Sequence, residues 1–459
     1  MGIESSPMMA LHSQLVRDPE YYIPDGNTVI QVENVLFKVH RYILSRDGSA
    51  FEGMFSLDNI PNSDSAETLI MPHSESIQTY PHSHLHHRHS SPEGASDKSP
   101  ILLTGDTAAD FRSLLWALYA LPADVFAMPS TQPQLNRLIG IARIAHKYAF
   151  RTTESWALSV LTMCVCQAPD TPSGHDIHGD VEADTEAGRS IVSSTELLIQ
   201  LTEVAVLCAH DELHEAVEPI WADLLFAGQT HDIVSAIGLA DRYTAQLRPL
   251  LGLAYYLMML KGKEEWLKSA SGDDEGDPEK MKKPRLTRDQ RIRLLSGYYN
   301  LSRACESLPS NPPKLTHHPS CYMPAQQAQQ AIGLGGAGTA AAHAHARCGE
   351  SWDTLWAGLV MNTASSNAMS NVKIQSVDLL RKMHMVNHVL ENMVNGVDGM
   401  AGADGSGAAN VASTFNMMGY GGAYAMAGNM NKHCLRMALK ASEEKVNDVL
   451  YGLADCFVE

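Results

Sequence analysis

The sequence predicts an α+β N-terminal domain followed by a mostly all-α C-terminal region, with disordered inserts between the folded parts. Near the N-terminus, over residues 25–41, apolar residues alternate with polar ones, which is typical of strands. From residue 191 onward, apolar residues recur at spacings of three and four, which is typical of helices. Between these parts lie stretches rich in Ser, Pro, His, Gly or acidic residues with no apolar period, so they cannot build a packed face.

The N-terminal domain is expected over residues 18–168, after a disordered N-terminus at residues 1–17. Its first element is residues 25–41, which open with a turn signal and alternate apolar and polar side chains on both sides of Glu33-Asn34. This pattern predicts a β-hairpin. The hairpin places two strands at the start of the domain, before any helix.

Helices and one further strand complete this domain. Residues 42–55 have helical spacing that is interrupted near Asp47-Gly48, which predicts one helix or two short ones. Residues 58–99 are expected to be a disordered insertion because Ser, Pro, Asp and His dominate them. A third short strand follows at residues 100–103, and a helix starts at Thr107. Two more helices are predicted at residues 135–149 and 153–164.

The rest of the chain divides into helical parts and polar connections. Helices are predicted at residues 197–209, 213–226, 233–243 and 247–261. The division is an acidic linker at 169–190, a helical domain at 191–268, a charged linker at 269–284, a helical region at 285–394 with a low-complexity insert at 325–346, a low-complexity segment at 395–431, and a C-terminal helix at 432–459.

Composition excludes several function classes. The 34 Lys and Arg against 52 Asp and Glu give a formal charge of −18, which argues against direct nucleic-acid binding because phosphate recognition relies on clustered cations. The longest apolar run, residues 250–260, is about half of the ~20 residues that a membrane-spanning helix needs, so no membrane partner is expected. The eight cysteines are scattered, which favours reduced thiols in the cytoplasm, the nucleus or both.

The hairpin and the helix after it also carry a sequence motif. An Asp-led strand is followed by a Phe-x-x-His-Arg turn and then by a helix in which Leu, Phe and Met recur at fixed places. This motif resembles the opening of the BTB/POZ domain, and the long helical region after it resembles the organisation of fungal BTB-domain proteins. The residues that carry the likeness are Asp25, Phe37, His40, Leu44, Phe51, Met54 and Phe55.

The resemblance implies a non-enzymatic protein–protein interaction module. Such a module dimerises through the BTB/POZ-like domain and, as a scaffold or adaptor, assembles complexes through the helical C-terminal region. It also implies two alternatives: a substrate receptor of a cullin-type ubiquitin ligase, with a cullin scaffold as partner, or a transcription cofactor. The chain has no clear hydrophobic-x-Glu cullin-contact motif, and neither a zinc-finger array nor kelch repeats follow the domain.

Each motif residue also has a purely structural interpretation. His40 can satisfy a strand-to-helix turn as a partly buried imidazole, a role that we favour over catalysis. Asp25 and Asp47 are either turn or cap residues or charges at a dimer face. Core and dimer-face positions are both open for Phe51, Met54 and Phe55.

The sequence offers little catalytic chemistry, and we expect neither an enzyme nor a cofactor. The helical pairs His210/His214 and His384/His388 lack the Glu that follows the first His in zinc proteases. A set of three, His317, Cys321 and Cys348, could bind zinc, but no Cys-x-x-Cys spacing supports it. Plain thiols are the alternative interpretation, and a metal-dependent enzyme built from these histidines and cysteines is the weakest functional hypothesis.

Overall fold

The computed structural model describes residues 14–57, 93–121, 123–124, 132–166, 194–268, 285–318, 337–365, 377–399, 427, 430 and 432–457. The chain forms two compact units, Met1–Ile220 and Trp221–Glu459. The first holds a four-stranded sheet with helices and the second is helical, so the predicted α+β N-terminal part and α-rich remainder are confirmed at this level. Within the described residues, no helix is long and apolar enough to cross a membrane.

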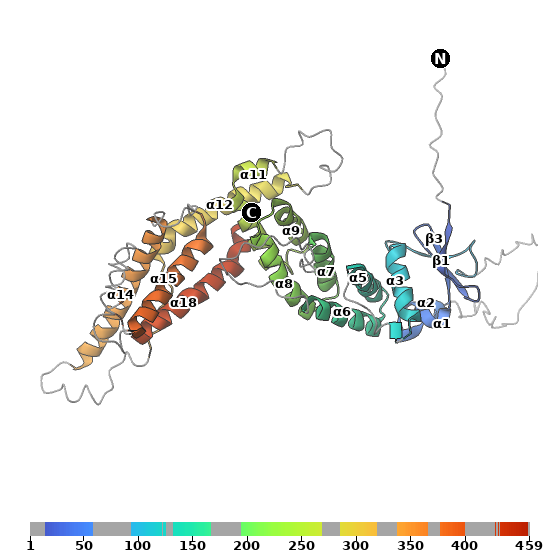
Figure 1. Ribbon diagram of the computed structural model, residues 1–459, viewed down its shortest axis with the longest axis horizontal. Helices are drawn as coiled ribbons and strands as arrows, with labels where there is room; N and C mark the ends of the chain where they lie inside the picture. The colour runs from blue at the N-terminus through green and yellow to red at the C-terminus, as the bar shows by residue number, and fades with distance from the viewer. Residues whose placement is uncertain are drawn as a thin grey trace, which may run out of the picture. The chain divides into compact units, whose positions relative to one another are not determined.

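The sheet of the first unit is built around the predicted hairpin (Figure 1). Strands β2 (Thr28–Val32) and β3 (Val35–Val39) pair antiparallel, and the turn between them places Glu33 in the left-handed region, with φ 53°. β1 (Val16–Tyr22) lies parallel to β3, and β4 (Ile101–Leu103) lies parallel to β2. The strand order is therefore β1-β3-β2-β4.

Helices cover the sheet and extend the first unit away from it. Helix α3 packs against α5 and contributes buried side chains to the core of the sheet, so it lies between the two (Figure 1). Its start at Thr107 is as predicted, because the Thr107 hydroxyl accepts a hydrogen bond from the Asp110 N–H. The helices are α1 (Arg41–Leu44), α2 (Ala50–Leu57), α3 (Ala108–Tyr119), α5 (Gln132–Lys147), α6 (Arg151–Cys166), α7 (Thr195–Leu207) and α8 (Asp211–Phe226), which continues into the second unit.

Two ends of the predicted disordered segments belong to the fold. Residues 14–17 precede or begin β1, which the sequence analysis did not predict at all. Residues 93–99, expected in the insertion, are held by two contacts of Asp97: it accepts hydrogen bonds from Arg17 and from the Tyr22 hydroxyl. Arg17 and Tyr22 are far from Asp97 in sequence, so no local pattern predicts these contacts. The remainder of the predicted insertion, residues 58–92, lies outside the described residues.

The first compact unit does not end at the acidic linker. Helix α7, which we assigned to a separate helical domain at 191–268, packs against α5 within the same unit. Leu198, Leu201 and Ala205 of α7 are buried, and this apolar face explains the association. The linker itself lies outside the described residues, as do residues 269–284.

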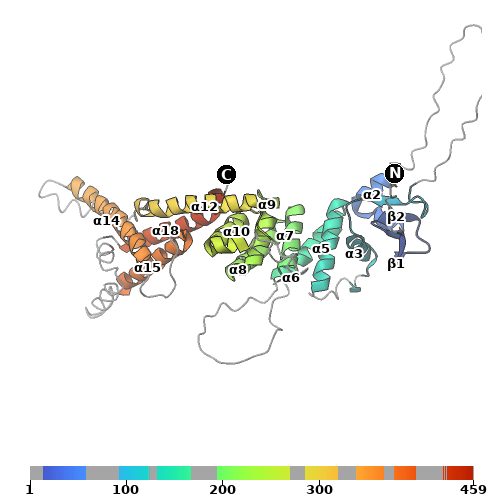
Figure 2. The ribbon, with the colours of Figure 1, turned by 90° about the horizontal axis from the view of Figure 1, so that it is seen from above.

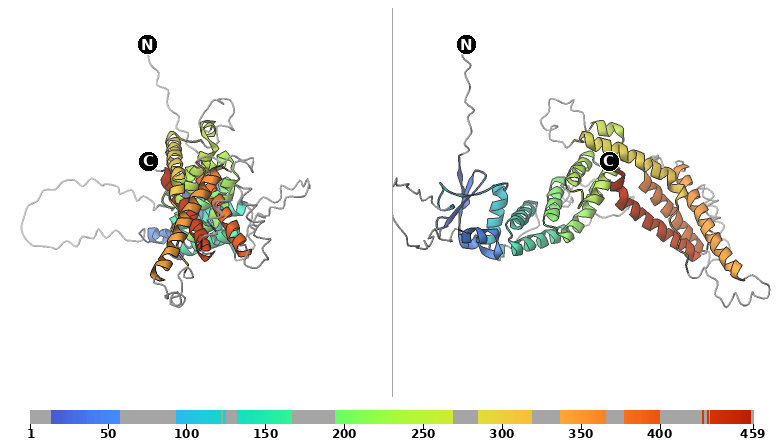
Figure 3. Two further views of the ribbon diagram at one scale, coloured as in Figure 1. Left: turned by 90° about the vertical axis from the view of Figure 1, so that its left-hand side faces the viewer. Right: turned by 180° about the vertical axis from the view of Figure 1, so that it is seen from behind.

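In the part of the second unit that the structure describes, all the regular elements are helices. α10 packs against α9 and α12 (Figure 2), and α15 packs against both α14 and α18 (Figure 3). α14 begins inside the predicted low-complexity insert, because its Ala-rich sequence has high helix propensity. The elements are α9 (Thr230–Arg242), α10 (Arg248–Lys261), α11 (Lys263–Lys268), α12 (Arg288–Ser307), η5 (Leu308–Ser310), α14 (Ala337–Ser365), α15 (Leu379–Gly399), α18 (Lys432–Gly452) and η7 (Leu453–Phe457).

Polar contacts in the second unit join segments that are distant in sequence. The Asp241 carboxylate on α9 accepts hydrogen bonds from Gln290 and Arg293 of α12, at 2.9 and 2.8 Å. The Tyr256 hydroxyl on α10 donates to Asp378 at 2.6 Å. Burial, followed by the charge of Asp378, raises the pKa of the Tyr256 phenol. It therefore stays protonated and keeps the start of α15 on α10.

Candidate functional site

Four of the seven BTB/POZ-like motif residues are buried in the core of the first unit. Phe37 and Leu44 are 0% exposed, Phe51 is 2% exposed and Phe55 is 6% exposed. The Phe37 ring packs edge-on against Phe111, with 5.0 Å between centroids. These side chains hold the sheet and its helices together, so none of the four can contact a partner in the folded unit. Of the two interpretations left open for Phe51 and Phe55, the structure places both in the core.

The other three motif residues reach the surface. Met54 is partly buried against the edge of the core, His40 is half-buried and the Asp25 side chain is 82% exposed. Any interaction role of the motif therefore rests on these three positions.

His40 is the last residue before α1 and is fixed by Tyr119. Its backbone N–H donates to the Tyr119 hydroxyl at 3.1 Å, and its Nδ1 lies 2.9 Å from the same oxygen. Burial is the main cause that raises the pKa of the Tyr119 phenol, so the hydroxyl keeps its proton. The other ring nitrogen of His40, Nε2, lies 3.5 Å from Asp25 Oδ2. All these contacts close a strand-to-helix turn, as the structural interpretation of His40 requires.

Asp47 is a cap residue. It has φ 65°, a conformation that Asp tolerates, and its Oδ2 accepts a hydrogen bond from the Thr152 N–H at 2.7 Å. Thr152 is the second residue of α6, so the carboxylate satisfies an otherwise unpaired N–H and complements the positive end of the helix.

Sequence reasoning missed Asp18, a buried charge of this unit. Its side chain is 0% exposed, and Oδ2 accepts two hydrogen bonds from the Arg112 guanidinium, at 2.9 and 2.6 Å. Oδ1 accepts the N–H groups of Glu20 and Tyr21. The carboxylate thus joins β1 to α3. The local signal for Asp18 was its place before Pro19 among acidic and apolar residues. This signal does not predict the contact with Arg112, which is distant in sequence.

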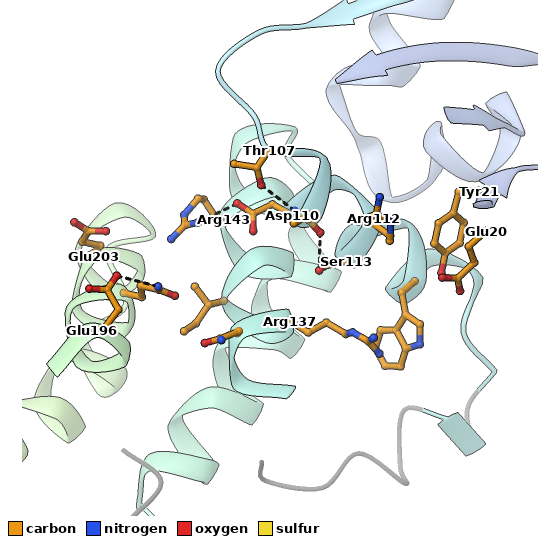
Figure 4. Close-up of a pocket in the computed structure, with 15 residues that line it drawn as sticks. Glu20, Tyr21, Thr107, Asp110, Arg112, Ser113, Arg137, Arg143, Glu196 and Glu203 are labelled. Atoms are coloured by element: carbon orange, nitrogen blue, oxygen red, sulfur yellow. Dashed lines mark hydrogen bonds and ion pairs between the residues drawn. The ribbon is translucent and has the colours of Figure 1, made fainter. Parts of the chain in front are cut away.

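A cleft of about 710 Å³ lies over α3, α5 and α7 in the first unit (Figure 4). Three arginines line it, and each is engaged: Arg143 with Asp110 at 2.9 Å, Arg112 with the buried Asp18, and Arg137 over the ring of Trp116 at 4.9 Å. Its lining includes no Cys, His or Lys. Four carboxylates, those of Glu20, Asp110, Glu196 and Glu203, face the three arginines in this lining, which leaves a formal charge of 3 − 4 = −1.

The second unit exposes an apolar stripe on α12. Ile292, Leu295 and Tyr299 are 42, 59 and 59% exposed, and their spacing of three and four residues places them on one helix face. Ile292 and Leu295 also line a groove with Trp266 and two arginines of α12, Arg288 and Arg291. We call Ile292, Leu295 and Tyr299 the α12 stripe.

Two clusters of metal-ligand side chains occur in the described ranges. In the first unit, His146, Glu154 and Cys208 come together. In the second unit, the structure brings two of the sequence-predicted residues, His317 and Cys348, to Cys434. Cys434 was not predicted, and the only local signal for it is its place after His433. Cys321 lies outside the described residues.

The helical histidine pairs have other roles. His210 Nδ1 accepts a hydrogen bond from the Leu213 N–H at 3.1 Å, so this ring caps the start of α8. His384 and His388 are exposed on α15, and His388 Nε2 lies 3.3 Å from the amide of Asn392, one turn away.

Comparisons with protein families, with curated proteins and with solved structures give no significant match. The assignment of a function therefore rests on the residues and their geometry.

Proposed function

We propose that this chain is a non-enzymatic interaction protein, whose N-terminal unit dimerises and whose helical unit binds a partner protein. The α12 stripe is the observation that carries the proposal. Large apolar side chains that remain in solvent along one helix face are unfavourable unless a partner covers them.

The chemistry around the stripe indicates the kind of partner. Arg288, Arg291 and Lys263 border the groove that Ile292 and Leu295 line. An amphipathic helix with apolar residues at every third or fourth position and acidic residues beside them would match this surface, because helix-in-groove recognition uses that spacing.

Exposed apolar residues of the first unit support dimerisation. Strands β1 and β4 are the two edges of the sheet, and edge strands present unpaired backbone groups. β1 contains Pro19 and an irregular register, which discourages pairing. On β4, Leu102 is 59% exposed, and on α1, Tyr42 is 75% exposed. We therefore place the dimer contact at β4 and α1.

Light scattering of the full-length protein tests the dimer. We expect a mass near twice 50.0 kDa at micromolar concentration, and a mass near 50.0 kDa for Leu102→Asp, because a charge at an apolar contact opposes association. Leu207→Asp is the matched control, since Leu207 is 46% exposed on α7. A monomeric wild type, or equal effects of both variants, would contradict dimerisation through β4.

Calorimetry with a cullin N-terminal scaffold on the same sample separates the alternatives. Binding at micromolar affinity or better would make the protein a ubiquitin-ligase substrate receptor. A dimer that gives no heat would leave the plain assembly role or a transcription cofactor.

A substitution in the α12 stripe tests partner binding. We expect Leu295→Asp to leave the helical content unchanged, because Leu295 is exposed, and to remove cross-links between α12 and partner proteins in cells. Leu207→Asp should leave these cross-links unchanged. If Leu295→Asp retained the same cross-linked proteins at the same yield, the stripe would not be the partner surface.

A further inference from the structure

Three segments that are far apart in sequence meet in the second unit. His317 lies in the irregular stretch after η5, Cys348 lies on α14 and Cys434 lies in the first turn of α18. His317 and Cys434 are 117 residues apart. Cys348 is 4% exposed, Cys434 is 0% exposed and His317 is partly buried.

The separations of the three ligand atoms match those of one metal site. Zinc binds sulfur at ~2.3 Å and nitrogen at ~2.0 Å in a tetrahedron, so its ligand atoms lie ~3.5–3.8 Å from one another. Here Cys434 Sγ lies 3.8 Å from His317 Nδ1, and all three ligand atoms lie within 4.8 Å of one another. A shift of less than about 1 Å would place them at zinc-bound distances.

Packing already holds two of the segments together. Trp352 Nε1 donates to the Pro313 carbonyl and Trp356 Nε1 donates to the Leu308 carbonyl, both at 2.8 Å. Cys348 precedes these tryptophans by one and two turns of α14, so all three side chains share a helix face. The same face that fixes residues 308–313 therefore directs the Cys348 thiol toward His317, and the ligands need little further ordering.

The surroundings of Cys434 favour a metal-bound thiolate. The His318 backbone N–H donates to Cys434 Sγ at 3.4 Å, which is the kind of contact that orients and stabilises a zinc-bound sulfur. The first turn of a helix also favours negative charge, because its N–H groups have no partner within the helix. Two thiolates and a neutral imidazole balance the charge of Zn²⁺, so net charge does not oppose burial of the site.

The cluster in the first unit lacks these properties. His146 Nδ1 and Glu154 Oε1 lie 2.8 Å apart, within hydrogen-bond distance. Burial, and then the neighbouring Glu154 charge, raises the pKa of the Cys208 thiol to about 12. Zinc would have to displace the proton of this thiol, because a cysteine binds zinc as the thiolate.

We propose that His317 Nδ1, Cys348 Sγ and Cys434 Sγ bind one structural zinc ion, which ties the stretch after α12 to α14 and α18. The preference for zinc follows from the donor set, since thiolates with imidazole in a tetrahedron select this ion. A fourth ligand would complete the tetrahedron.

Metal analysis of the full-length protein, purified with reductant and without chelator, is the first test. We expect about one equivalent of zinc per chain, and a lower melting temperature after the zinc is removed with a chelator. Co²⁺ added to the zinc-free protein should give the near-ultraviolet charge-transfer band of thiolate ligands. Both measurements use the wild type, so they do not depend on whether a variant folds.

Variants then assign the ligands. Cys434→Ser and Cys348→Ser should each lose most of the zinc and the cobalt band. Cys305→Ser should retain both, and it is a matched control because Cys305 is also buried in the second unit, at 8% exposure. The proposal is overturned if the reduced wild type binds less than about a tenth of an equivalent with zinc supplied, if Cys434→Ser binds as much zinc as Cys305→Ser, or if mass spectrometry finds Cys348 and Cys434 joined as a disulfide without metal.

Discussion

Replacement of Phe37 by Ala is expected to destabilise the N-terminal unit by about 3–5 kcal/mol, the range for Phe-to-Ala changes in packed cores. Phe37 of β3 is 0% exposed, and its ring packs edge-on against Phe111 of α3. Its removal deletes the apolar contacts and leaves a cavity that two rigid elements cannot close. Urea unfolding monitored by circular dichroism would measure the loss of free energy.

Tyr42→Ala is the control for Phe37→Ala. Tyr42 is 75% exposed on α1, and surface changes of this kind usually alter the free energy of unfolding by less than about 0.5 kcal/mol. Both variants should be compared below the concentration at which the protein dimerises, since Tyr42 belongs to the proposed contact. A loss below about 1 kcal/mol for Phe37→Ala would show that Phe37 is not a core residue.

Phe457→Ala should destabilise the helical unit by a similar amount, about 3–5 kcal/mol. Phe457 is 2% exposed and stacks on Tyr255 of α10, with 5.4 Å between ring centroids. Asn300 of α12 also donates to the Cys456 carbonyl at 2.9 Å, which holds η7 in place. Tyr451→Ala, at a residue that is 65% exposed on α18, is the control in the same unfolding measurement.

Gly297 gives a sharper form of the same experiment. A Cβ atom at Gly297 would overlap the Phe457 ring, so Gly297→Ala should destabilise the otherwise wild-type protein. In the Phe457→Ala background the ring is gone, and the same change should instead stabilise α12 by up to about 1 kcal/mol through helix propensity. The sign of the Gly297→Ala effect would then reverse between the two backgrounds. If Gly297→Ala changed stability in the same direction in both backgrounds, Phe457 would not pack on α12 as described.

Local patterns predicted most of the individual elements. The hairpin at residues 25–41 was found because alternation and a turn signal lie within one short segment. The helices around residues 197–261 were found for the same reason, since their apolar spacing is a local property. β1 was missed because its burial alternates poorly, its register is irregular and it contains Pro19. Its place in the sheet depends on β3 and on the Asp18–Arg112 pair.

The motif residues show that a sequence pattern can identify important positions without deciding whether they are buried. The sequence identified Phe37, Leu44, Phe51 and Phe55 as important, but it left core and partner contact open for the phenylalanines of α2. The burial of Phe51 and Phe55 decides between core and partner contact. This burial depends on how α3 and the helices after it pack against α2. The BTB/POZ-like interaction role stays a prediction, now carried by Asp25, His40 and Met54 and by the exposed side chains of β4 and α1.

The sequence by itself determined the α+β and all-α parts, the hairpin, the helix start at Thr107 and the predominance of acidic charge, because each depends on neighbouring residues or on composition. Only the tertiary structure decided that α7 belongs to the first unit, that Asp18 meets Arg112, and that Cys434 meets His317 and Cys348. These contacts join residues between about 50 and 120 positions apart. Their partners are selected by the packing of whole helices and strands, and no spacing within a single segment encodes that choice.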